Sequence, residues 1–353
     1  MDFLKIFHID CGRKYFTPEE LKRIIVRLGQ NGFNTIELAF GNGGMRFLLN
    51  DMEIVTSVGR YGSSEVRTAI NSGNRAFCDC GTNELTEEEM EELIYEAERK
   101  GIQIMPLLNT PGHMDAIVTA MKELHMAEVG YRGSVSTFDL ACTEAAEFTK
   151  ALLQKYVGWF ADHGCTYFNM GCDEYANDVM NSGFEALCSG DDFKYDMFVA
   201  YVNDVAGGIF KKGMRPVMFN DGMYYDGTET GGELRRDIIC AYWSTGWEGY
   251  RLAPARCIEQ HGHKIINTSN SWYYVLGRRK DEGNNPIFNN EMALEGIKRT
   301  GIGEIPGGAD NEPIGAMLCL WCDEPGIVYT EEEEKIVAGL IEEFGRNSGQ
   351  CFE

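Results

Sequence analysis

The sequence has no apolar run long enough to cross a membrane, so we expect no transmembrane helix. Residues 1–8 lack a basic segment followed by a long apolar one, and we therefore expect no signal peptide. Basic residues are scarce as well: 32 Lys and Arg stand against 55 Asp and Glu, which gives a net charge of −23. Because phosphate backbones and anionic membranes attract basic surfaces, we expect neither nucleic acid nor a membrane as a partner. Neutral glycans are compatible with this charge.

The 12 cysteines lack the paired spacing of a zinc site. Cys78-Asp79-Cys80 and Cys319-Leu320-Trp321-Cys322 each stand alone, so we predict no metal and no other cofactor. Several cysteines lie in apolar runs, which is typical of buried free thiols. Free thiols persist in reducing compartments, and we therefore predict a cytoplasmic protein. A chain trimmed of a secretion signal would look the same.

Short apolar runs alternate with helical patterns along the whole chain, as in a parallel sheet covered by helices. We predict eight strands, over Lys5–Ile9, Thr35–Phe40, Gln103–Leu108, Thr166–Cys172, Pro216–Asn220, Ile238–Trp243, Lys264–Thr268 and Ala316–Trp321. Thr17 and Thr86 are each followed by Glu three positions later, a capping box that predicts a helix start. Thr143 and Thr330 open two further helical stretches.

Eight strand–helix units without a linker predict an α/β fold, a single (β/α)8 TIM barrel. We expect residues 1–353 to form one catalytic domain with no accessory domain. A doubly wound open sheet is the alternative, but it needs a Gly-rich phosphate loop after the first strand, and residues 11–14 are not one. Long irregular loops are expected over Gly41–Leu85 and Ser271–Asn290, on the face where strands end.

In such a barrel the chemistry lies at the carboxyl ends of the strands. The adjacent acids Asp173 and Glu174 end the fourth predicted strand, where their repulsion and desolvation are costly. Other strand ends carry polar and aromatic residues: Arg13, His113, Asp221, Trp243, Trp272, Tyr273, Trp321 and Asp323. The strand ends show no cysteine–histidine or serine–histidine partner set. One tryptophan alone is most often a core residue, but aromatic faces combined with carboxylates and amides suit a pyranose ring and its glycosidic oxygen.

The chain resembles glycoside hydrolase family 20, the β-N-acetylhexosaminidases, over essentially its whole length. It is most similar to the catalytic modules of bacterial exo-β-N-acetylglucosaminidases. The resemblance rests on five strings in order, each at a predicted strand end: Ile9–Phe16, Asn109–Ala116, Asn169–Asp178, Asn267–Gly277 and Trp321–Asp323. It departs from many family members at Asn42, where they carry Asp, and at Phe219, where they carry Trp.

The resemblance implies a retaining mechanism in which the 2-acetamido oxygen of the substrate is the nucleophile. Glu174 is then the general acid and base, and Asp173 orients the acetamido group and stabilises the oxazolinium ion. Tyr273 is expected to donate to the acetamido carbonyl, with Tyr274 as the alternative if the register is off by one. Repulsion between the two acids is expected to raise the pKa of one of them.

The same resemblance implies how a glycan with a terminal β-N-acetylhexosamine is bound. Trp243 and Trp321 match walls of the acetamido pocket, and Arg13 and Asp323 match residues that hold the terminal hydroxyls and so give exo action. The remaining expected substrate contacts are His113, Trp272 and Tyr274, with a supporting role for His113 left open. The implied activity is removal of terminal GlcNAc or GalNAc. Release of a disaccharide such as lacto-N-biose, a non-catalytic glycan-binding barrel and a metal-dependent hydrolase are the alternatives.

Overall fold

The computed structural model describes residues 2–78, 83–188, 195–225, 233–247, 250–280 and 287–347. Within them eight parallel strands form a barrel: β1 (Leu4–Ile9), β2 (Thr35–Asn42), β6 (Gln103–Thr110), β7 (Tyr167–Gly171), β8 (Arg215–Phe219), β9 (Ile239–Tyr242), β12 (Ile265–Asn267) and β14 (Gly315–Trp321). The barrel closes because β1 pairs with both β14 and β2. The predicted (β/α)8 fold is confirmed, and each predicted strand is present with small shifts at its ends.

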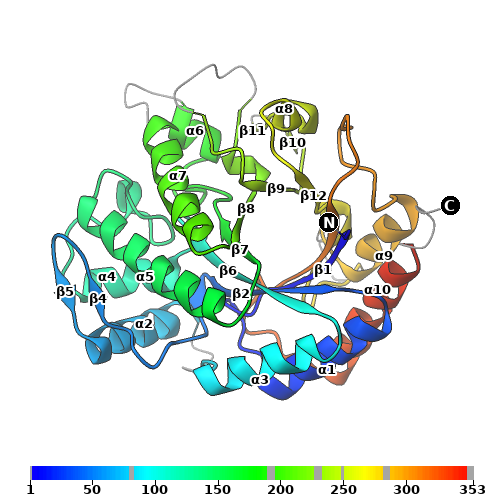
Figure 1. Cartoon of the computed structure of the whole chain (residues 1–353), viewed down its shortest axis with the longest axis horizontal. Helices are drawn as coiled ribbons and strands as arrows, with labels where there is room; N and C mark the ends of the chain where they lie inside the picture. The colour runs from blue at the N-terminus through cyan, green and yellow to red at the C-terminus, as the bar shows by residue number, and fades with distance from the viewer. Residues whose placement is uncertain are drawn as a thin grey trace.

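Helices surround the strands on the outside (Figure 1). They are α1 (Pro18–Gln30), α2 (Ser63–Phe77), α3 (Glu87–Glu98), α4 (Asp115–Glu123), α5 (Thr143–Asp162), α6 (Gly183–Cys188), α7 (Tyr195–Lys211), α8 (Ala255–Gln260), α9 (Asn290–Arg299) and α10 (Glu331–Asn347). The helices α1 and α10 come from opposite ends of the described chain and pack side by side (Figure 1).

Shorter elements decorate the barrel. They are the strands β3 (Gly44–Met45), β4 (Ile54–Val55), β5 (Arg60–Tyr61), β10 (Gly246–Trp247), β11 (Tyr250–Arg251) and β13 (Tyr273–Val275), and the 3-10 turns η1 (Tyr131–Gly133), η2 (Asn220–Gly222) and η3 (Asn270–Trp272). Of these, β13 pairs in parallel with β14 beyond the end of β12. It therefore continues the barrel wall toward the face where the strands end.

Three of the four predicted helix starts have the expected cap. Thr17 and Thr86 each form a complete capping box at the start of α1 and α3. The Thr330 hydroxyl accepts a hydrogen bond from the Glu333 backbone N–H at 3.3 Å and so caps α10. Helix α5 differs, because its cap position is Cys142, which makes no side-chain bond there.

The expectation of a long irregular loop over Gly41–Leu85 is wrong. This segment contains the β4–β5 hairpin and the 15-residue helix α2, which buries Val66, Ala69 and Ile70. Helix α2 packs so closely on α4 that a Cβ atom at Gly73 would lie 2.1 Å from the carbonyl oxygen of Ala116. The spacing of buried residues in α2 is that of a helix, and the polar residues between them concealed it. The second expected loop contains η3 and β13, and its residues 281–286 lie outside the described ones.

The inside of the barrel holds a polar layer beneath the carboxyl ends of the strands. His8 Nδ1 lies 2.6 Å from Glu37 Oε1, and the Asn169 amide donates to Glu37 Oε2 at 2.9 Å, with all three side chains fully buried. The His8 ring contacts the indole of Trp321, with 4.2 Å between ring centroids. This layer therefore supports one wall of the cavity above it.

Two other sequence expectations concern the described residues directly. None of their helices combines the length and the apolar character that crossing a membrane requires. Nine of their cysteines are free, whereas Cys78 is in a disulfide. The expectation of buried free thiols in apolar runs is confirmed at Cys172, Cys240 and Cys319. Cys78, which follows the end of α2, is not in such a run.

Candidate active site

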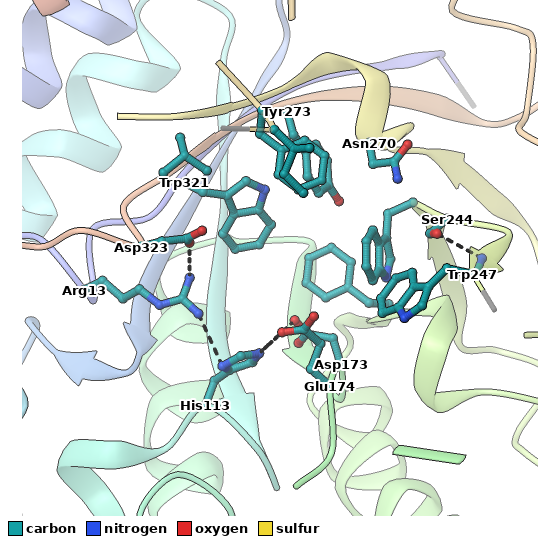
Figure 2. Close-up of a pocket in the computed structure, with 16 residues that line it drawn as sticks. Arg13, His113, Asp173, Glu174, Ser244, Trp247, Asn270, Tyr273, Trp321 and Asp323 are labelled. Carbon is teal, nitrogen blue, oxygen red and sulfur yellow. Dashed lines mark hydrogen bonds and ion pairs between the residues drawn. The ribbon is translucent and has the colours of Figure 1, made fainter. Parts of the chain in front are cut away.

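A pocket of about 540 Å³ opens where the barrel strands end (Figure 2). Its size is typical of small-molecule sites. The residues that line it are Arg13, His113, Asp173, Glu174, Phe219, Trp243, Ser244, Gly246, Trp247, Asn270, Tyr273, Val275, Ile287, Phe288, Trp321 and Asp323. They include eight of the ten site residues predicted from the sequence.

The backbone after β7 adopts an uncommon conformation. Gly171, Cys172, Glu174 and Ala176 all have positive φ, at 70°, 65°, 49° and 59°. Three of these are not glycines, and such a run persists only where the surroundings hold it in place. A Cβ atom at Gly171 would lie 1.9 Å from Oδ1 of Asn109, so only glycine fits at that position. This bend turns the two acids that lie within it, Asp173 and Glu174, into the pocket.

Asp173 is the more buried of the two acids, with 12% of its side chain exposed against 33% for Glu174. Asn109 donates to Asp173 Oδ1 at 2.8 Å, and Nε2 of His113 lies 3.4 Å from Oδ2. Burial opposes the charged form, but His113 and Asn109 outweigh it and hold the pKa of Asp173 below its usual value. Asp173 is therefore a fixed carboxylate that can accept a hydrogen bond from a ligand.

His113 bridges both acids. Its Nε2 also lies 3.3 Å from Oε2 of Glu174, while Arg13 Nη2 lies 3.3 Å from Nδ1 (Figure 2). Burial alone would lower the pKa of His113, but the neighbouring carboxylates raise it to about 10. Asn42 accepts a hydrogen bond from the Asn109 amide at 3.2 Å. The raised pKa keeps His113 protonated between the two acids, although the neighbouring Arg13 guanidinium opposes that charge.

A third acid, Asp221, lies behind the pair. Its oxygens accept from the Glu174 backbone N–H at 2.7 Å, the Trp243 indole N–H at 2.8 Å and the Tyr250 hydroxyl at 2.8 Å. Burial first, and then the charge of Asp173, raise the pKa of Asp221 to about 7. Asp221 therefore holds its proton more readily than an ordinary aspartate does. The sequence placed Asp221 at a strand end, but nothing in the sequence distinguished it from an ordinary acid there.

Aromatic rings form the opposite wall. Trp243 and Tyr273 lie nearly parallel, with centroids 6.1 Å apart and planes at 13°, and Trp321 is tilted against Tyr273 at 5.6 Å. Phe219 lies 6.1 Å from Trp321 and completes the floor. Burial, with the nearby Cys319 and Asp173, raises the pKa of Tyr273 well above its usual value, so its phenol stays protonated and able to donate. These rings therefore form an apolar enclosure in which the Tyr273 hydroxyl can act as a donor.

Charged residues stand at one side of the pocket. Arg13 Nη1 donates to Asp10 at 3.0 Å and to Asp323 at 3.2 Å, and Arg278 Nη2 lies 3.4 Å from the other oxygen of Asp323. The exposed indole of Trp247 lies on the opposite side, across the two acids (Figure 2). Arg278 was not expected from the sequence, because its contacts with Asp323 and with the Ile287 carbonyl oxygen form only in the folded chain.

Residues 5–322 match the family described as glycosyl hydrolase family 20, catalytic domain. The chain belongs to glycoside hydrolase family 20. It is 35% identical to the pneumococcal virulence factor StrH in a solved structure that concerns N-glycan recognition and hydrolysis, with a TM-score of 0.91 over 98% of this chain and 83% of that one. The structure of dispersin B, at 19% identity and a TM-score of 0.72, covers 98% of this chain and 99% of that one, and shows the shared fold alone.

Curated relatives match over shorter stretches of their own length. A lacto-N-biosidase of Bifidobacterium bifidum is 24% identical over 263 residues, which are 71% of this chain and 22% of that protein. A β-hexosaminidase of Vibrio furnissii is 26% identical over 180 residues, 48% of this chain and 28% of that protein. The chain thus spans less than a third of the length of these two relatives.

Two residues expected to contact substrate lie away from this family 20 pocket. Trp272 is fully buried and packs edge-on against Phe344 of α10, with centroids 5.2 Å apart. The Tyr274 hydroxyl donates to Glu333 of α10 at 2.6 Å. Side chains alternate along a strand, so Tyr273 faces the pocket and Tyr274 faces the helices. The expectation for Trp272 and Tyr274 as substrate contacts does not agree with the structure.

Proposed function

We propose that this chain is a retaining exo-β-N-acetylhexosaminidase that removes terminal β-linked GlcNAc or GalNAc from glycans. The observation that carries the proposal is the convergence of Asp173, Glu174 and Tyr273 on one aromatic pocket. A carboxylate and a phenol are the acceptor and donor that an acetamido group needs at its N–H and its carbonyl oxygen. The rings of Trp243 and Trp321 provide apolar surface for its methyl group and for the sugar face.

In the first step, Asp173 accepts the acetamido N–H and Tyr273 donates to the carbonyl oxygen. That oxygen then bonds to the anomeric carbon from the face opposite the leaving group. Glu174 gives its proton to the glycosidic oxygen as the bond to the anomeric carbon breaks. The positive charge that develops on the oxazolinium ring is stabilised by the carboxylate of Asp173, whose contacts with His113 and Asn109 hold it in place.

In the second step, Glu174 takes a proton from water, and the water oxygen bonds to the anomeric carbon while the ring opens. Two displacements at one carbon restore its configuration, so the product keeps the β-anomer. The greater exposure of Glu174 suits this exchange with leaving group and water, and the burial of Asp173 suits a fixed role.

Exo action follows from the charged side of the pocket. Arg13 and Asp323 offer a donor and an acceptor for sugar hydroxyls, and their ion pair stands where a further sugar on the non-reducing side would have to pass. Release of a single sugar is therefore favoured over release of a disaccharide. The similarity to a lacto-N-biosidase keeps disaccharide release as the second candidate, and the assay below separates the two.

The test is hydrolysis of aryl β-glycosides of GlcNAc, GalNAc and lacto-N-biose by the wild-type chain beside Glu174→Gln. We expect release of GlcNAc or GalNAc, inhibition by a thiazoline mimic of the oxazoline, and a loss of about 10²–10⁴-fold in Glu174→Gln on poor leaving groups. Turnover of a 2-deoxy analogue at the wild-type rate would contradict participation of the acetamido group. Binding without turnover would indicate a glycan-binding barrel, and loss of activity on chelation would indicate a metal-dependent hydrolase.

A cytoplasmic location stays a prediction. The nine free cysteines of the described residues are compatible with a reducing compartment, whereas the disulfide at Cys78 is not typical of one. The redox state of Cys78 in the purified chain, measured by thiol labelling with and without a reductant, bears directly on this prediction.

A further inference from the structure

Three donors from three separate segments converge on Asp221. The Glu174 N–H comes from the bend after β7, the Trp243 indole from the end of β9, and the Tyr250 hydroxyl from the β10–β11 hairpin. Oδ2 accepts two of these bonds and Oδ1 accepts the third. An amide at position 221 has one acceptor oxygen and would turn its own N–H groups toward a donor, so only a carboxylate satisfies this arrangement.

Burying Asp221 also costs free energy. It is 1% exposed, and no Lys, Arg or His of the described chain forms an ion pair with it. A buried carboxylate without a cation loses its hydration and recovers only what its hydrogen bonds return. Its neighbour Asp173 adds repulsion. Such a residue points to a function of the three hydrogen bonds that it accepts.

The bond to Glu174 is the one with catalytic consequences. Glu174 has a φ of 49°, and its N–H points into the barrel wall, where Asp221 accepts it. Among the described residues, the carboxylate of Glu174 is held by His113 alone, at 3.3 Å. Gly222, next to Asp221, packs so closely that a Cβ atom there would lie 2.2 Å from the Cys172 carbonyl oxygen. The orientation of the Glu174 side chain is therefore set mainly by its backbone, and the backbone by the β8 end.

We propose that Asp221 is a positioning residue for the general acid: it fixes the Glu174 peptide, and it ties that peptide to the Trp243 wall and to the hairpin that carries Trp247. The inference rests on the proposed function, because it assigns Glu174 as the proton donor. Tyr250 connects the hairpin to Asp221. Its hydroxyl donates to Asp221, and its ring stacks on Trp247 with 4.4 Å between the ring centroids. One carboxylate thus connects the acid to the leaving-group side of the pocket.

This role makes a distinctive kinetic prediction. A misplaced general acid slows hydrolysis most when the leaving group is poor, since a good leaving group departs without protonation. In Asp221→Asn we expect kcat/KM to fall about 10–100-fold on a 4-methylumbelliferyl or alkyl glycoside, as a part of the ~10²–10⁴-fold that general acid catalysis provides. The loss on a 2,4-dinitrophenyl glycoside should be only a few-fold. Thiazoline binding should weaken only a few-fold, because its polar contacts are expected from Asp173 and Tyr273 and only the Trp243 wall is joined to Asp221.

Tyr250→Phe is the matched control. It removes one of the three donors and leaves the Glu174 bond, so we expect a small loss that is equal for both leaving groups. Asp221→Glu keeps the carboxylate but moves it by one methylene. It should show the same dependence on leaving group, with smaller losses. It provides the test if Asp221→Asn does not fold, as judged by circular dichroism and thiazoline binding.

The outcomes separate the two proposals. Wild-type inactivity on both glycosides would overturn the proposed function, and the role of Asp221 with it. An active wild type, with equal losses on both glycosides in Asp221→Asn and Asp221→Glu, would overturn only the positioning role, because it would show that Asp221 merely supports the pocket. A loss that grows as the leaving group becomes poorer would support the inference.

Discussion

Arg13 and His113 are in contact, with 3.3 Å between Arg13 Nη2 and His113 Nδ1. Arg13 also holds Asp323, and His113 reaches Glu174, so one continuous path joins the side of the pocket that we propose binds sugar hydroxyls to the proposed general acid (Figure 2). The two ends of this path serve different tasks in the proposed reaction. Because they share Arg13 and His113, a change at one end is expected to alter the other.

The first prediction concerns Arg13→Lys. Lysine keeps the charge but lacks the planar fork that reaches Asp323 and His113 together. We expect KM to rise and kcat to fall, with a combined loss of about 10–100-fold, the size of one to two charge-assisted hydrogen bonds. Steady-state kinetics on one glycoside measure both. Arg278→Lys is the matched control: Arg278 holds the other oxygen of Asp323, and its remaining side-chain partners in the described chain are Glu324 and Ile287, so only KM should change. A change in KM alone in both variants would count against the shared path.

The second prediction compares two adjacent tyrosines. Tyr273→Phe removes the proposed donor to the acetamido carbonyl, and a lost donor of this kind costs about 10²–10³-fold in rate. Tyr274→Phe removes a bond to Glu333 outside the pocket, so kcat/KM should stay unchanged while thermal stability falls. Kinetics and thermal unfolding of both variants check this pair. Equal losses of activity would show that the assignment of inward and outward faces on β13 is wrong.

A third prediction separates two tryptophans. Trp272 packs against Phe344 in the helical layer, and its replacement by Ala should lower the free energy of unfolding by about 3–5 kcal/mol, the cost of deleting a large buried ring. Trp321 lines the pocket, so Trp321→Phe should raise KM and weaken thiazoline binding with a smaller effect on stability. Denaturant titration beside inhibitor binding distinguishes them. A Trp272→Phe variant that folds normally but fails to bind thiazoline would contradict the placement of Trp272.

The sequence predicted the barrel and the acid pair because both depend on local order along the chain. Each strand is a short apolar run, and Asp173 and Glu174 follow one of them directly. What could not be predicted depends on contacts between distant segments. To predict which way the side chains of Trp272 and Tyr274 point, one must know the register of β13 on β14. The role of Asp221 requires Trp243 and Tyr250, and that of Arg278 requires Asp323, 45 residues away.

The prediction for helix α2 failed although its signals lie close together in the sequence. Its signals were local, with a spacing of Val66, Ala69 and Ile70 that fits a helix and with Glu65 accepting from the Gly62 backbone N–H at 3.2 Å. Polar residues between the buried positions and a glycine at the cap made the segment resemble a loop. Its helical state depends on packing against α4, where Gly73 permits a close approach to Ala116. Tertiary packing therefore decided a structure that local propensity left undetermined.

The last prediction concerns the pH dependence of stability at His113. Its pKa is raised from 6.5 to about 10 in the folded chain, chiefly because Asp173 and Glu174 outweigh its burial. A pKa that is higher when folded means that protonated His113 stabilises the fold fully below its unfolded pKa, and that this contribution is lost as pH rises through about 10. The difference in the free energy of unfolding between wild type and His113→Gln should thus be largest near pH 6 and smallest above about pH 10. Urea titrations across this range measure it.

Asn109→Ala, which removes an uncharged contact to Asp173, is the control and should show a constant difference. A constant difference for His113→Gln as well would show that its charge contributes nothing to the fold.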